Sequence, residues 1–281
     1  MKVDLCTWTK NGAKTLIPVL ERIDDVVPSE KLGEKIAVDD SSRDATVKIL
    51  KDFNWKVYPN RSGFINGGTA EALHHVRSEF FISIEQDVLL ARNWWNIVPK
   101  NMDDEKVAVA QGVEISTNRA ERGIDQYHLK KLKQMPLEKR AKLWKTIGNN
   151  IYRSKIIKKL GFVEDSTAMT PFYRKITSNG FKWITDIKAI STHLHGNILD
   201  AVRHTVTFYS LTQENTYLDR MSTYRYLAGV AFSPFKGLKM AITTNEPQVQ
   251  LLLMLRKLAL TPTFFKRKKR KRYNLQKMTQ I

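Results

Sequence analysis

The stretch FFISIEQDVLL, residues 80 to 90, is an apolar run that leads into two acidic side chains, Glu85 and Asp87. Its aromatic and β-branched residues predict a buried strand, and the acids mark where that strand ends. Hard divalent ions such as Mg²⁺ and Mn²⁺ prefer carboxylate oxygens and commonly share their ligands with substrate phosphates. An isolated pair of acids in a turn is common without any ion, so a metal-binding role for Glu85 and Asp87 needs support from the rest of the sequence.

Around this strand, short β-rich runs alternate with helical periodicity. The predicted strands span residues 3–9, 35–39, 55–59, 80–85 and 106–111. Residues 13–27 carry apolar side chains on one helical face, and Asp44 is predicted to cap a second helix. This alternation predicts an α/β fold with a mostly parallel sheet flanked by helices.

Four consecutive predicted strands end in polar side chains. An open parallel sheet binds its ligands outside the carboxyl ends of its strands, so these side chains would meet at one edge. Each acid on its own could equally cap a helix, but together they predict a ligand site. The side chains in question are Thr9, Lys10, Asn11, Asp39, Asp40, Asn60, Arg61, Glu85 and Asp87.

The 281 residues carry a net charge of +19, which indicates an anionic partner such as a phosphorylated substrate, nucleic acid or lipid headgroups. The densest basic run, FFKRKKRKRY at 264–273, follows the apolar LLLMLRKLAL at 251–260. This order is typical of a segment on an anionic membrane surface, although a solvated tail or a nucleic-acid-binding arm has a similar composition.

The single Cys6 lies in an apolar stretch and is predicted to be a reduced core thiol. No apolar run approaches the roughly 18 to 20 residues that cross a bilayer, and no leader sequence is evident. We therefore expect a cytoplasmic protein that lies on the cytoplasmic face of the membrane through its basic C-terminal tail.

Four motifs occur in the order and spacing of the family 2 glycosyltransferases. They are CTWTKNGAKTL at 6–16, IAVDDSSRDATVKIL at 36–50, SIEQD at 83–87, and the block from IGNN to GFKW at 147–183. They resemble, in turn, that family's P-T-Y-N-E start, its V-D-D-G-S-x-D-x-T signature, its D-x-D motif, and its acceptor-side block with an E-D pair. The resemblance implies the GT-A fold of the nucleotide-diphospho-sugar transferases, a nucleotide-sugar donor, and Mn²⁺ or Mg²⁺ as cofactor.

Carried over position by position, the resemblance implies a nucleotide site in the first half of the chain. Thr7, Thr9 and Asp39 would hold the base and ribose. Asp40 would support their loop, and Arg61 matches a position near the nucleotide.

The same resemblance implies a metal site and a catalytic base. Asp87 would bind the metal ion, Glu85 would face the donor's sugar or ribose, and the late H-x-H-G stretch offers His193 and His195 to complete the metal site. Asp165 of the E-D pair would be the general base, with Glu164 beside it. Asp165 could alternatively cap the helix that follows.

The chain departs from the family pattern in three places. Ser41 and Ser42 stand where Gly-Ser is usual, and Glu85 replaces the first Asp of D-x-D. Thr69 and Ala70 fall where the family has Arg and Asn, so the donor contacts of that loop are not transferred.

We predict two domains. Residues 1–197 would form the catalytic domain, with a nucleotide-sugar-binding half at 1–112 and an acceptor-side half at 113–197 that carries a helical flap. Residues 198–281 would form a helical, basic, membrane-associating extension.

The predicted function is inverting transfer of a sugar to a hydroxyl group of a glycan or of a lipid-linked sugar. A polyprenyl-phosphate sugar synthase is the alternative within the class, although a phosphate oxyanion needs no base. A basic nucleic-acid-binding protein without catalysis is the alternative from another class. It is disfavoured because the basic residues gather in the tail.

Overall fold

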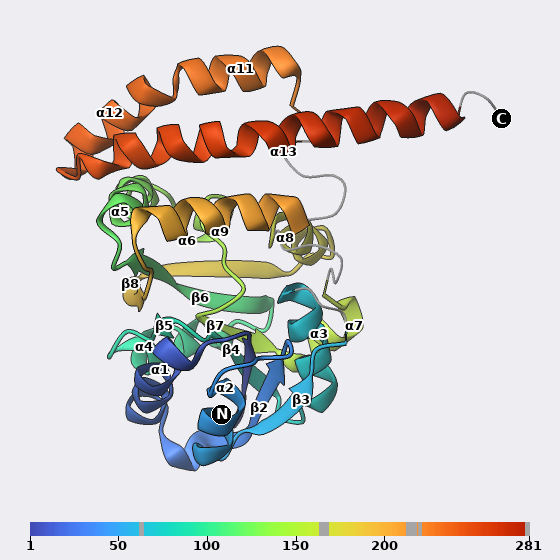
Figure 1. Ribbon diagram of the computed structural model, residues 1–281. Helices are drawn as coiled ribbons and strands as arrows, with labels where there is room; N and C mark the ends of the chain where they lie inside the picture. Colours follow the sequence, from blue (N-terminus) through green and yellow to red (C-terminus); the bar gives the residue numbers. More distant parts are fainter. Residues whose placement is uncertain (62–64, 163–168, 212–217, 219–220, 279–281) are drawn as a thin grey trace. The chain divides into compact units, whose positions relative to one another are not determined.

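The computed structural model describes residues 1–61, 65–162, 169–211, 218 and 221–278 (Figure 1). The chain forms two compact units. The first contains Met1–Ser116 and His128–Leu194, and the second contains Thr117–Tyr127 and His195–Ile281. The domains expected at 1–197 and 198–281 remain predictions.

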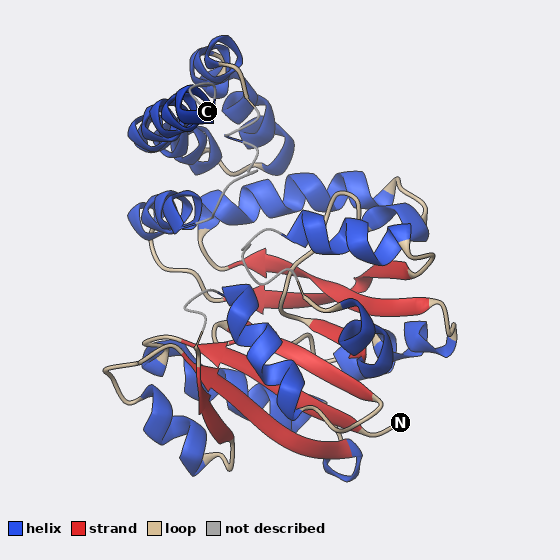
Figure 2. Cartoon of the chain, turned by 90° about the vertical axis from the view of Figure 1, so that its right-hand side faces the viewer, coloured by secondary structure: helices blue, strands red, loops and turns tan. Residues whose placement is uncertain are grey.

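An eight-stranded sheet with the order β3-β2-β1-β4-β7-β6-β8-β5 forms the centre of the first unit (Figure 2). β1 pairs in parallel with β2 and β4, β2 with β3, and β6 with β8, whereas β7 and β5 are antiparallel to their neighbours. The predicted, mostly parallel sheet is therefore confirmed. Its strands are β1 (Val3–Thr9), β2 (Leu32–Asp39), β3 (Lys56–Pro59), β4 (Phe80–Glu85), β5 (Val88–Leu89), β6 (Val107–Ser116), β7 (Asn150–Arg153) and β8 (Lys182–His193).

The helices of the first unit connect these strands. One further helix, α5 (Arg119–Lys133), is divided between the units, because its residues up to Tyr127 belong to the second unit and those from His128 to the first. The others are α1 (Ala13–Val26), α2 (Thr46–Asp52), α3 (Ile65–His75), α4 (Trp94–Ile97), α6 (Leu137–Arg140), α7 (Ser154–Leu160) and α8 (Met169–Ser178), with 3-10 turns at Ser29–Lys31 and Pro99–Asp103.

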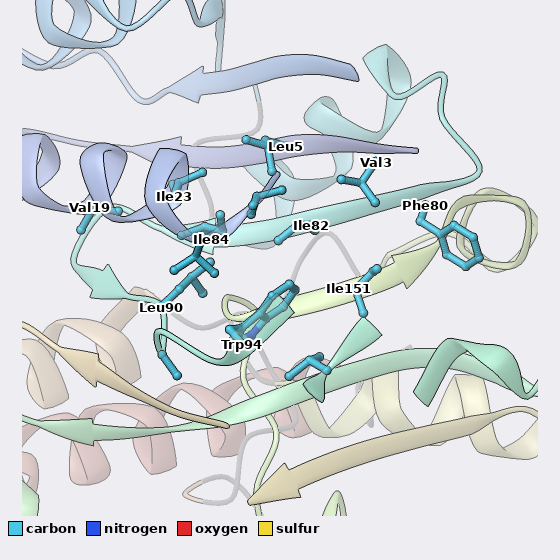
Figure 3. Packing of buried hydrophobic residues seen from close by; sticks show 14 of the residues in the cluster. Val3, Leu5, Val19, Ile23, Phe80, Ile82, Ile84, Leu90, Trp94 and Ile151 are labelled. Atoms are coloured by element: carbon cyan, nitrogen blue, oxygen red, sulfur yellow. The ribbon is translucent and has the colours of Figure 1, made fainter. Parts of the chain in front are cut away.

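The apolar face of α1 packs on one side of the parallel strands. Figure 3 shows Val19 and Ile23 of α1 beside Leu5 of β1 and Ile84 of β4, all in one buried cluster. Trp94 lies in the same cluster and is fully buried, so it packs the core. The face predicted for this helix consists of Leu16, Val19, Leu20, Ile23 and Val27, all of which are buried.

The predicted cap of the second helix is displaced by one residue. Ala45 occupies the N-cap position of α2 and makes no side-chain cap hydrogen bond. Asp44 precedes it, and its Oδ1 accepts a hydrogen bond of 3.0 Å from the backbone N–H of Thr46. The carboxylate therefore still satisfies one of the free N–H groups of the first turn.

A buried carboxylate fixes the start of β1. Asp4 accepts hydrogen bonds from the backbone N–H groups of Glu34 (2.9 Å), Arg77 (2.6 Å) and Ser78 (2.9 Å), and from Ser78 Oγ (2.8 Å). Burial is the largest influence on the pKa of Asp4 and raises it, but these donors together outweigh burial and leave the pKa below its usual value.

Replacing Asp4 with alanine is expected to lower the free energy of unfolding by about 2 to 3 kcal/mol at neutral pH, because three backbone donors lose their charged acceptor. The pKa of Asp4 is lower in the folded chain than the value of 3.8 in the unfolded chain, so its carboxylate stabilises the fold above about pH 3.8. This stabilisation is lost as the pH falls through the folded-state pKa. The deficit should therefore shrink in urea titrations run below about pH 4. Asp25→Ala, at an exposed position of α1, is the control and should stay close to wild type. A deficit that does not change with pH would contradict this account.

The described part of the second unit is helical. Besides the start of α5, it contains α9 (Ile198–Leu211), α11 (Thr223–Ala231), α12 (Ser233–Thr244) and α13 (Gln248–Met278). The basic run at 264–273, expected to be a tail, is part of α13. Among these and the other described helices, none combines the length and the apolar character needed to cross a bilayer.

An ion network holds three segments of this unit together. Glu121 of α5 contacts the ring of His195 and the guanidinium group of Arg256 in α13. Burial, the largest influence, raises the pKa of Glu121, but the interactions with His195 and Arg256 together outweigh burial and lower the pKa to about 2. The carboxylate is thus kept charged inside the unit.

Candidate functional site

Asp39 is held firmly at the carboxyl end of β2, next to the end of β1. The strand register places it opposite Thr9, whose Oγ1 donates to Asp39 Oδ1 at 2.9 Å. Ser42 donates twice, from its backbone N–H to Oδ2 at 2.8 Å and from its hydroxyl to Oδ1 at 2.6 Å. The carboxylate is therefore fixed in orientation while 8% of the residue remains exposed.

The loop after Asp39 requires a left-handed backbone. Ser41 has a φ of 56°, a conformation that costs a residue with a side chain about 1 to 2 kcal/mol and costs glycine little. Glycine, the usual residue here in the family that the motifs resemble, would adopt this φ at little cost. Asp40 lies in the same loop and forms an ion pair of 2.7 Å with Lys10.

Thr7 and Arg61 are the remaining nucleotide-site candidates. Thr7 is buried in β1, two residues before Thr9 and on the same face of the strand. Arg61 is exposed after β3, directly after Asn60, whose backbone N–H donates to the carbonyl of Asp39 at 2.9 Å. The fold thus brings the backbone at Arg61 to the same sheet edge as Asp39.

Glu85 and Gln86, at the end of β4, form hydrogen bonds with the backbone of two other segments. Glu85 Oε1 accepts a hydrogen bond of 3.1 Å from the backbone N–H of Gly148. Gln86 binds both backbone groups of Lys10, accepting from its N–H at 2.9 Å and donating to its carbonyl at 3.2 Å. Sequence reasoning missed Gln86, and its place between the two acids was the only signal for it.

Asp87, His193 and Glu114 form a contiguous polar cluster. His193 Nε2 lies 3.3 Å from Asp87 Oδ1, and His193 Nδ1 lies 3.5 Å from Glu114 Oε2. The antiparallel pairing of β5 with β8 sets Val88 opposite His193 and so brings Asp87 to it. Glu114 is a buried acid of β6 that sequence reasoning missed, and its signal was one acid in the apolar strand VAVAQGVEIS.

The electrostatics of this cluster favour a cation. Burial is the largest influence on the pKa of His193 and lowers it, but Asp87, Glu114 and Glu85 together raise it to about 10. Three acids thus concentrate negative charge around one imidazole. Carboxylate oxygens with an imidazole nitrogen are a donor set that suits Mn²⁺, and carboxylates suit Mg²⁺.

Three predicted site residues remain. His195 belongs to the second unit, where its backbone N–H donates to Thr117 Oγ1 at 3.0 Å and its ring contacts Glu121. Glu164 and Asp165 lie in the segment 163–168, outside the described residues.

Comparison with known proteins gives the same family as the sequence motifs. A family model described as "Glycosyl transferase family 2" matches residues 4–161. No curated protein sequence matches the chain.

Several solved structures have a similar fold. One is the mannosyltransferase PcManGT from Pyrobaculum calidifontis in complex with GDP-Man and Mn²⁺, with a TM-score of 0.59 and 15% identity, covering 92% of this chain and 86% of that one. Another is S. aureus TarS 1-349 in complex with UDP, with a TM-score of 0.54 and 14% identity, covering 95% and 92%. A third is GalNAc-T7 with UDP, GalNAc and Mn²⁺, with a TM-score of 0.54 and 14% identity, covering 90% and 56%. The predicted GT-A fold is confirmed.

Proposed function

Since this chain belongs to glycosyl transferase family 2, we propose that it transfers a sugar from a nucleotide-diphosphate sugar to a hydroxyl group of a glycan or of a lipid-linked sugar, with inversion at the anomeric carbon. The observation that carries the proposal is a linked set of polar groups at the carboxyl ends of the parallel strands. Lys10 connects two of its parts, since its ammonium group pairs with Asp40 and its backbone binds Gln86, the neighbour of Asp87. A cleft at this edge of the sheet is where such a fold binds its ligands.

The nucleotide would bind at the ends of β1, β2 and β3. Asp39 is the central residue, because a carboxylate held by Thr9 and Ser42 keeps the capacity to accept hydrogen bonds from ribose hydroxyls. Thr7 and Asp40 would support this loop, and Arg61 would lie near the nucleotide.

Asp87 and His193 would hold a divalent ion, Mn²⁺ or Mg²⁺. His195 follows His193 by two residues, so the chain itself keeps it near enough to be a third ligand. Mn²⁺ is present with GDP-Man in the PcManGT complex and with UDP and GalNAc in the GalNAc-T7 complex. When bound, the ion would neutralise the negative charge that the nucleoside diphosphate gains as it leaves.

Glu114 would orient His193 through its second ring nitrogen, and the change Glu114→Gln tests this. We expect the affinity for Mn²⁺ to fall about tenfold or more, because an imidazole ligand depends on the acceptor behind it. Calorimetric titration of Mn²⁺ into the full chain measures the affinity, and excess Mn²⁺ should restore most of the transfer activity. Glu105→Gln, at an exposed position before β6, is the control. Equal Mn²⁺ affinity in wild type and Glu114→Gln would refute the role of Glu114.

On the opposite face of the sugar, a carboxylate would take the proton from the attacking hydroxyl. We assign this role to Asp165, with Glu164 beside it, on the family resemblance of the E-D pair. A single displacement assisted by a base inverts the anomeric carbon through an oxocarbenium-like transition state.

The protein would work at the surface of an anionic cytoplasmic membrane. Support comes from the basic run within α13, since each basic residue near anionic headgroups contributes about 1 kcal/mol to binding. A lipid-linked acceptor would be presented at that surface.

Radiolabelled UDP, GDP and dTDP sugars with Mn²⁺ test the reaction. Lipid-linked oligosaccharide and polyprenyl phosphate are offered in separate reactions, and we expect label in the oligosaccharide. Label in polyprenyl phosphate would establish the synthase alternative in its place. The proposal would be rejected if no donor bound or reacted and the chain instead bound DNA or RNA with a steep salt dependence.

A further inference from the structure

α11 and α12 expose large apolar side chains to solvent. Phe232, Phe235 and Ile242 are 66%, 69% and 75% exposed. Scattered apolar residues on a surface need no explanation, but six large exposed ones between residues 224 and 242 are a concentration that proteins rarely leave uncovered. We call Tyr224, Leu227, Phe232, Phe235, Leu238 and Ile242 the outward stripe.

The helical period separates the outward stripe of α12 from its packing face. Phe235, Leu238 and Ile242 follow one another at spacings of three and four residues, so they share one side of the helix. The opposite side carries the buried Gly237 and Met240. A Cβ atom added at Gly237 would lie 2.6 Å from the Cα of Gln250, so α12 approaches the backbone of α13 closely on that side.

α11 has the same two-sided character. Its Tyr226 is fully buried, stacks on Phe264 of α13 with ring centroids 4.0 Å apart, and donates its hydroxyl hydrogen to the carbonyl of Lys257 at 2.8 Å. Tyr224 and Leu227 do not share this buried side of the helix and are exposed. The internal packing of this unit is thus satisfied without the outward stripe.

The charge of the surrounding chain indicates what covers the stripe. Residues 221–281 contain thirteen lysines and arginines and a single acid, Glu246, which already pairs with Arg122 at 2.8 Å. Lys236 and Lys239 are exposed on the same helix as the stripe. A partner that offers negative charge above an apolar interior matches both features, and an anionic lipid bilayer has that profile.

The other candidate occupants fit less well. A second copy paired through the same face would bring its lysines against those of the first, and like charges facing one another are unfavourable. Nucleic acid would satisfy the charge but offers no apolar phase for aliphatic residues such as Leu238 and Ile242.

We propose that the outward stripe of α11 and α12 inserts into the headgroup region of an anionic membrane, with Lys236 and Lys239 at the level of the lipid phosphates. The inference rests on the membrane association in the proposed function and extends it from the basic run of α13 to a second surface. It does not depend on the transfer reaction.

Flotation of the full chain with vesicles tests the proposal. Wild type should bind vesicles of phosphatidylcholine with phosphatidylglycerol and bind pure phosphatidylcholine weakly. The double variant Phe235→Ser with Ile242→Ser should bind the anionic vesicles about 100-fold less tightly, since two large side chains lose their burial. Leu199→Ser is the matched control, because Leu199 is an exposed leucine of α9 and lies outside the stripe.

A fluorescent label checks insertion without altering the rest of the stripe. Cys6 is fully buried, and burial raises the pKa of its thiol well above the usual value, so it should resist labelling. Ile242→Cys can therefore carry a polarity-sensitive dye on a known position. Its emission should shift to the blue with anionic vesicles, whereas the same dye on Leu199→Cys should not shift.

Wild-type binding by the double variant, or an unchanged emission at position 242, overturns the proposal. So does a loss of self-association in the double variant without any effect on vesicles, because the stripe would then be an interface between copies. Asp87→Asn should bind vesicles like wild type, so a failure of the transfer reaction and a failure of this inference are separately visible.

Discussion

Replacing Asp87 with asparagine is expected to lower the transfer rate about 1000-fold or more, which corresponds to about 4 kcal/mol of transition-state stabilisation. Asparagine keeps the size of the side chain and a carbonyl oxygen but removes the charge that faces His193 at 3.3 Å. The change should also weaken binding of Mn²⁺, because a neutral amide is a poorer ligand for a hard cation than a carboxylate. Turnover at saturating donor and acceptor measures the first effect, and calorimetric titration of Mn²⁺ measures the second.

Asp25→Asn is the control for this experiment, since it makes the same chemical change at an exposed position of α1. It should leave both turnover and Mn²⁺ affinity unchanged. If Asp87→Asn kept the wild-type rate while remaining folded, the proposed metal site would be wrong. If it lost activity but bound Mn²⁺ normally, Asp87 would act on the donor and not on the ion.

The second large effect is expected at Asp165. Asp165→Asn should lower the rate by about 100-fold to 10,000-fold, the usual contribution of a positioned general base. Donor and Mn²⁺ affinities should stay at wild-type values, because the base acts on the acceptor hydroxyl. The pH profile of the rate should lose its acidic limb, since that limb reports the protonation of the base.

Glu164→Gln separates the two neighbouring acids. It should retain most of the activity and an unaltered pH profile. The assignment would be reversed if Glu164→Gln were the inactive variant and Asp165→Asn the active one. A loss of donor binding in Asp165→Asn would instead point to a structural role for that carboxylate.

The parallel half of the sheet was predictable from local pattern. Residues 3–9 and 80–85 were expected as strands and are β1 and β4 with those bounds. The reason is that a strand buried on both faces is a short apolar run, and in this chain a polar residue closes each run. The same closing residues indicated the edge where Asp39 and Asp87 lie.

The remaining contacts depend on pairings that no local pattern encodes. Glu114 reaches His193 because β6 and β8 lie side by side in parallel, although they are far apart in sequence. Gln86 meets Lys10 because β1 and β4 are neighbours. The basic run of α13 was expected to be a tail, yet lysine and arginine are good helix formers, and their propensity favours extending the helix that precedes them.

The division of α5 between the two units bears on how this protein could be altered by recombination. The second unit takes Thr117–Tyr127 from the middle of the chain, and Ala120 within that segment packs with Ala201 and Leu252. A C-terminal segment from a homologue, joined at a single crossover point, would therefore arrive without its own residues 117–127, the part of α5 that packs with it. A viable chimaera would need three crossovers, two flanking residues 117–127 and one before His195, so that both segments of the second unit come from the same parent.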